Sequence, residues 1–178
     1  MKYFIYLISI IILLGLNLGL FSLFPIRGQL PNLLFLMALC ASLWKKDFDF
    51  FFISLISGLF LDFFSTGFFG AYTLALLTMS LCLHLFANNV LITEFNWKTL
   101  SVAAAFSWLF FSIMVWLYSL AAFKLNLNVE NIGFKFFIGG FFPSLFYNLL
   151  LLHPIRAVSN FLKLYVDNLI IRGRGVIR

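Results

Sequence analysis

The residue best placed to do chemistry is an aspartate in a strongly apolar stretch, residues 54–72, which read SLISGLFLDFFSTGFFGAY. Asp62 has no basic residue within ten positions on either side. An unpaired carboxylate is costly to bury, and ionisable side chains inside membrane segments often serve function. Two interpretations follow. The carboxylate faces a cavity or a partner helix, or it accepts hydrogen bonds from the backbone of the chain reversal that follows it.

A small, polar stripe runs through the same segment. Ser54, Gly58 and Asp62 are four residues apart and Ser65 follows three further on, which places them on one face of a helix. Small residues let helices approach closely. The stripe is therefore expected to point into protein and not into lipid.

The residues after this stripe predict a tight reversal into the next helix. Ser65 and Thr66 can cap the start of that helix, and Gly67 and Gly70 permit a sharp turn or close packing. In the structural interpretation, Asp62 locks the corner between the two helices.

A second polar stripe lies in the last apolar segment and consists of Gly140, Pro143, Ser144, Tyr147 and Asn148. Asn148 can form a hydrogen bond across helices, typically worth ~0.6–2 kcal/mol, so we interpret it as a packing residue. His84 stands alone near the end of the fourth segment, where we expect an interfacial group and not a proton relay.

Motifs for catalysis are missing. The chain has no G-x-x-x-x-G-K-[ST] loop and no H-E-x-x-H, its two histidines lie far apart and its few acids are scattered. We therefore expect no enzyme activity, no cofactor, no metal ion and no nucleic-acid partner.

The amino-acid composition indicates whether the surface of the chain faces water or lipid. It has 178 residues, of which 63% are hydrophobic and only 10% charged, whereas soluble domains carry about 25% charged residues. Such a chain cannot cover its surface with polar groups, so the sequence predicts an integral membrane protein.

Six apolar segments predict an all-α fold, a six-helix transmembrane bundle: 3–24, 30–44, 48–64, 68–87, 100–123 and 133–152. The second, which Pro31 opens, and the third are short, because fifteen residues rise only ~23 Å against a hydrocarbon core of ~30 Å. They either span a thinned bilayer or form a re-entrant hairpin that turns at residues 45–49.

The basic residues predict the orientation. With the N-terminus inside, nine of them fall on the inner side and three on the outer side, so both termini should be cytoplasmic.

Residues 1–154 form the expected transmembrane domain. Residues 155–178 form an expected cytoplasmic amphipathic helix, with an apolar stripe, and a basic tail. The tail suits anionic lipid or a protein partner. The stripe comprises Ile155, Val158, Leu162, Tyr165 and Leu169.

The stretch LPNLLFLMALCASLW, a short charged tip and SGLFLDFFSTGFFGAYTLALL together resemble the rod shape-determining protein MreD family. That family has a proline-led second segment followed by G-[LF]-x-x-D-x-x-[ST]-x-x-x-x-G. The matching positions here are Pro31, Gly58, Asp62, Ser65, Gly67 and Gly70, and Asn148 and Pro154 resemble the end of the family's last span. Phe68 stands where the family often has proline.

The resemblance implies a non-enzymatic scaffold of the bacterial inner membrane that binds the bitopic protein MreC. Its further partners would be the glycosyltransferase RodA, a class B penicillin-binding transpeptidase and the actin-like MreB, which together direct peptidoglycan synthesis at the lateral wall. The family's fold is similar to that of the substrate-binding subunits of ECF-type transporters. The alternative function is therefore that of a vitamin-binding transporter subunit with an outer-side polar pocket, although polar residues are sparse.

Overall fold

The structure is a computed structural model that describes residues 2–25, 29–44, 48–65, 69–89, 97–124 and 134–175, with backbone alone for 89, 134–139 and 170–175. The described residues form helices and no strand, which confirms the all-α prediction, and each expected apolar segment contains a helix. The elements are α1 (Lys2–Leu18), the short 3-10 helix η1 (Phe21–Leu23), α2 (Leu33–Ser42), α3 (Asp49–Phe64), α4 (Ala71–Asn89), α5 (Trp97–Lys124) and α6 (Phe134–Gly175).

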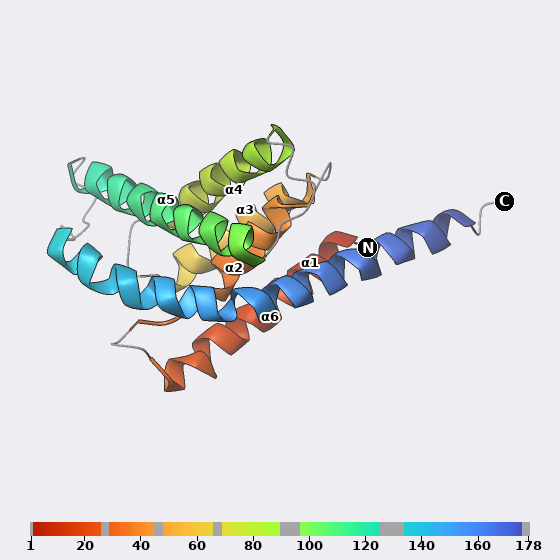
Figure 1. Cartoon of the computed structure of the whole chain (residues 1–178), viewed down its shortest axis with the longest axis horizontal. Coiled ribbons are helices and arrows are strands. Elements are labelled where there is room, and N and C mark those ends of the chain that lie inside the picture. Colours follow the sequence, from red (N-terminus) through yellow and green to blue (C-terminus); the bar gives the residue numbers. More distant parts are fainter. Residues whose placement is uncertain are drawn as a thin grey trace.

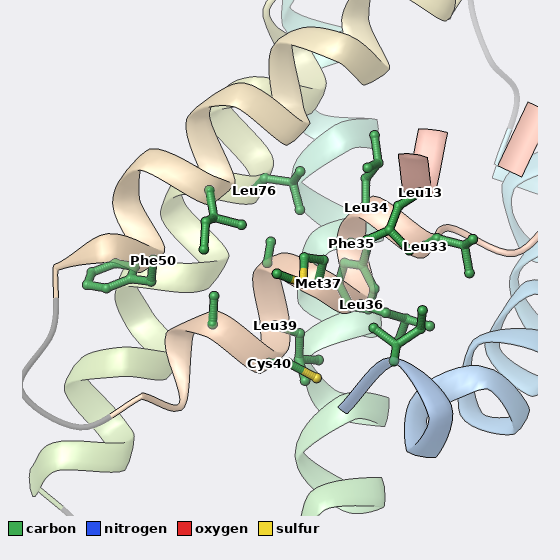
Figure 2. Close-up of a cluster of buried hydrophobic side chains, with 14 of the residues drawn as sticks. Leu13, Leu33, Leu34, Phe35, Leu36, Met37, Leu39, Cys40, Phe50 and Leu76 are labelled. Atoms are coloured by element: carbon green, nitrogen blue, oxygen red, sulfur yellow. The ribbon is translucent and has the colours of Figure 1, made fainter. Parts of the chain in front are cut away.

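Helix α2 lies at the centre of the molecule, in contact with α1, α3, α4 and α6 (Figure 1). Each of its ten residues is buried, and Figure 2 shows Phe35, Met37 and Leu39 packed among side chains of the surrounding helices. A helix that is apolar on all sides requires such a position. Ten residues rise only about 15 Å, so α2 is too short to cross a bilayer on its own.

Among the described residues, three stretches are long and apolar enough to cross a membrane: Lys2–Leu23, which joins α1 to η1, Ala71–Asn88 and Trp97–Lys124. Their outer faces carry large exposed apolar side chains, among them Ile12 and Phe106. Exposed apolar surface on this scale is suited to lipid and not to water. The chain therefore has the composition and helix lengths of a membrane protein.

Helix α6 runs without a break over 42 residues and contains both Pro143 and Pro154. The boundary that we expected after residue 154 thus falls inside one continuous helix, whose C-terminal end projects past the other helices (Figure 1). Val158 and Tyr165 of the expected apolar stripe are exposed, and their contact with a membrane surface stays a prediction. A buried face runs through Ile155, Ser159 and Val166, because the first turns after Pro154 still pack on the bundle.

One ion pair fixes the relative position of α1 and α3. The ammonium of Lys2 lies 2.6 Å from the carboxylate of Asp49, and the hydroxyl of Tyr6 donates to the same carboxylate at 3.1 Å. Helices α1 and α3 therefore begin at one end of the bundle. We call the opposite end, where α1 and α3 finish and α2 and α4 begin, the distal end.

Candidate functional site

Asp62 lies in the last turn of α3 and caps the start of α4. One carboxylate oxygen accepts the backbone N–H of Tyr72 at 2.9 Å, and the other accepts the N–H of Thr73 at 3.0 Å together with the Thr73 hydroxyl. The first N–H groups of a helix have no acceptor within the helix and carry partial positive charge. The geometry therefore supports the structural interpretation, in which this carboxylate locks a helix corner.

Gly58, one turn before Asp62, permits the close approach of α3 to α4. A Cβ atom on this glycine would lie 2.4 Å from the Cα of Thr73, far inside van der Waals contact. Ser54 and Ser57 are fully buried, whereas Phe63 on the opposite face is 70% exposed. The prediction that the small stripe points into protein is confirmed, and α4 is the helix it meets.

The turn after Asp62 differs from expectation in its capping. Ser65 has an extended backbone, and its hydroxyl donates to the Asp62 carbonyl at 3.3 Å, so it closes α3 while Asp62 supplies the cap of α4. Gly70 has a φ of +99°, a conformation that other residues rarely adopt. Its carbonyl accepts the N–H of Leu74 at 2.9 Å. Thr66 and Gly67 lie outside the described residues.

The second polar stripe holds the chain between α1 and α2 against α6. The side-chain oxygen of Asn148 accepts the backbone N–H of Asn32 at 2.8 Å, while the Asn32 side chain caps α2 by accepting the N–H of Phe35 at 2.9 Å. Pro31 directly precedes this cap and is not the first helical residue. Asn148 is thus a packing residue, as expected, and it fixes the residue that starts α2.

Two further contacts extend this attachment towards the start of α6. Tyr147 donates its hydroxyl to the carbonyl of Phe24 at 3.0 Å, and the Ser144 hydroxyl donates to the side-chain oxygen of Gln29 at 3.3 Å. A Cβ at Gly140 would lie 3.1 Å from the Gln29 side chain. Small residues on α6 therefore make room for the linker.

Replacing Asn148 by leucine should destabilise the protein by about 1–2 kcal/mol, because the N–H of Asn32 loses its acceptor. Thermal unfolding in detergent, followed by circular dichroism, measures the effect. Phe146→Leu is the control, since Phe146 lies on the same helix and is 60% exposed. Equal melting temperatures for the two variants would contradict this role of Asn148.

His84 joins the end of α2 to α4. Its Nδ1 donates to the carbonyl of Ser42 at 3.0 Å, and its Nε2 accepts from the Asn88 amide at 2.9 Å, while the ring stacks on Phe50 with centroids 4.3 Å apart. This side chain is buried within the protein, and its position at the membrane interface stays a prediction. Both ring nitrogens are engaged in packing helices.

A cavity of about 550 Å³ lies at the distal end of the bundle. It is bounded by the ends of α1 and α3, the start of α4, the middle of α5, the first half of α6 and the linker before α2. Its walls are mainly apolar, with a few polar side chains that include Asn17, Gln29, Trp108 and Ser112. The transporter alternative implies an outer-side pocket, but the sequence did not show which residues would line it, since they come from six separate segments of the chain.

Among the described residues, no three His, Cys, Asp or Glu side chains are grouped so that they could hold a metal ion. Comparison of the chain with protein-family models, with curated proteins and with solved structures finds no match.

Proposed function

We propose that this chain is a membrane scaffold of the MreD type, which binds MreC and helps to position peptidoglycan synthesis at the lateral wall. The observation that carries this proposal is the α3–α4 corner. Gly58, Asp62 and Gly70, which carry the resemblance to that family, form one structural unit here: a close helix contact, a capping carboxylate and a turn. A carboxylate engaged by three donors organises a fold and is poorly placed to act on a substrate.

The proposal includes a topology. Helices α1, α4 and α5 cross the bacterial inner membrane, the first half of α6 crosses with them, and the shorter α2 and α3 complete a six-helix bundle similar to the ECF substrate-binding subunits. Both termini are cytoplasmic. The second half of α6 then lies at the inner surface, where the basic residues 172–178 meet anionic lipid. RodA, the class B transpeptidase and MreB are contacted directly or through MreC.

Co-purification tests the scaffold function. The tagged chain is expressed with each single-span membrane protein encoded beside it and solubilised in mild detergent. We expect a stable complex with a single-span protein that has a periplasmic coiled coil, the type of partner that MreC represents. Recovery of the chain alone, or together with a transporter ATPase module, would contradict the scaffold.

A pair of glycine variants makes this test specific for the corner. Gly58→Ala forces α3 away from α4, whereas a Cβ at Gly15 in α1 meets nothing within 4 Å. We expect Gly58→Ala to recover several-fold less partner than Gly15→Ala. Equal recovery would show that the corner does not shape the binding surface.

The distal cavity favours a second candidate, the substrate-binding subunit of a small-solute transporter. That function requires a pocket on the outer side, and the proposed topology puts the distal end there. Recovery of the chain with an ATPase module and a bound solute would select this candidate.

A further inference from the structure

Two side chains that line the distal cavity each carry a buried polar atom with no hydrogen-bond partner among the described residues. They are the side-chain oxygen of Asn17, on α1, and the indole N–H of Trp108, on α5. The two side chains are only 7% and 8% exposed. Buried polar groups are nearly always hydrogen-bonded, so each such exception calls for an explanation.

The chemistry of these two atoms limits what could satisfy them. The Asn17 oxygen accepts a hydrogen bond, and an indole N–H only donates one. A matching molecule therefore offers both a donor and an acceptor, as a hydroxyl or an amide does.

The other residues that line the cavity indicate the net charge of the bound molecule, its apolar part and its size. Among the described residues that line the cavity none is charged, and a charged ligand would remain unpaired by them at a cost that burial makes large. The apolar wall includes Leu14, Leu61, Phe111 and Val115. A volume of about 550 Å³ lies within the range of about 300–1,000 Å³ that is typical of small-molecule sites.

We propose that the distal cavity binds an uncharged amphipathic molecule, with its hydroxyl or amide end at Asn17 and Trp108 and its apolar body against Phe111 and Val115. The molecule is either a neutral membrane lipid or a neutral solute, since both carry this chemistry. The inference does not depend on the scaffold function, because every wall of the cavity belongs to this chain.

The test uses the full chain, purified alone in mild detergent. Lipid and aqueous extracts of the purified protein are analysed by mass spectrometry, and 1-oleoylglycerol is titrated as a probe while thermal unfolding is followed. We expect an uncharged molecule in one extract, with the extract identifying its source, or a saturable rise in melting temperature with the probe. A charged molecule as the only one retained, or neither retention nor saturable stabilisation, would overturn the proposal.

Three variants assign the binding to the cavity. Asn17→Leu removes the acceptor at nearly constant shape, and Trp108→Phe removes the donor while it keeps an aromatic ring beside Phe35 and Phe111. Asn160→Leu is the matched control, because Asn160 is exposed on α6 away from the cavity. We expect each cavity variant to lose tenfold or more in retained ligand or probe affinity, while the control matches the original chain.

The same variants separate binding from a purely structural role. If the cavity holds no ligand, Asn17→Leu should raise the melting temperature and leave the extracts and the probe titration unchanged, because it only removes an unpaired buried oxygen. That result would overturn the proposal. Since no partner protein takes part in this assay, its failure is distinguishable from a failure of the scaffold function.

Discussion

Asp62→Leu is expected to destabilise the protein by about 2–6 kcal/mol, because two backbone N–H groups at the start of α4 each lose an acceptor at ~1–3 kcal/mol. Both carboxylate oxygens accept hydrogen bonds, so Asp62→Asn should fall between leucine and the original residue. The asparagine side chain keeps one acceptor oxygen, but its NH₂ group cannot accept a hydrogen bond from the second backbone N–H. Reversible unfolding in detergent micelles, read by far-ultraviolet circular dichroism, gives the three free energies.

Thr73→Val is the matched control for this series. It removes only the hydroxyl that donates to Asp62 and leaves both backbone N–H donors in place, so its cost should be well below that of Asp62→Leu. If leucine at position 62 proves as stable as aspartate, the carboxylate does not organise the corner. That result would favour the other interpretation, in which the Asp62 carboxylate faces a cavity or a partner helix.

The helix corner could be predicted from the sequence because its determinants are local. Gly58 and Asp62 share one helix face, and the residues that Asp62 binds follow only ten and eleven positions later. The helical spacing therefore showed which face is buried. It did not show which donors the carboxylate would meet, and it offered Ser65 as a cap of the next helix, a position that Asp62 takes in the structure.

The attachment of α6 to the linker could not be predicted in the same way. Asn148 and Asn32 are 116 positions apart, and Ser144 and Gln29 are 115 apart. Periodicity identifies a polar stripe but not the segment that lies across it. The distal cavity depends on the same long-range packing, so nothing in the sequence distinguished Asn17 from an ordinary polar residue in an apolar helix.

The continuity of α6 through Pro154 illustrates a different limit. Proline removes one backbone hydrogen bond and commonly ends a helix, and the composition changes at this position, so local signals favour a boundary. Burial on both sides of Pro154 opposes them, since Leu152 and Ile155 both pack into the core. Tertiary packing therefore keeps the helix continuous where local preference predicts a break.

Gly58→Ala is expected to cost about 1–3 kcal/mol or more, as overpacking of a close contact does. The new Cβ would meet the Cα of Thr73 at 2.4 Å, and a backbone atom cannot rotate away as a side chain can. Moving α4 aside would also lengthen the hydrogen bonds to Asp62, so the two effects should add.

Gly15→Ala supplies the control for this substitution with the opposite expected sign. No atom lies within 4 Å of the new Cβ, and alanine is favoured over glycine in a helix interior by about 0.5–1 kcal/mol. Gly15→Ala in α1 should thus raise the melting temperature of the protein, whereas Gly58→Ala in α3 should lower it. Equal effects at the two positions would mean that helix propensity, and not the close contact of α3 with α4, governs the response at Gly58.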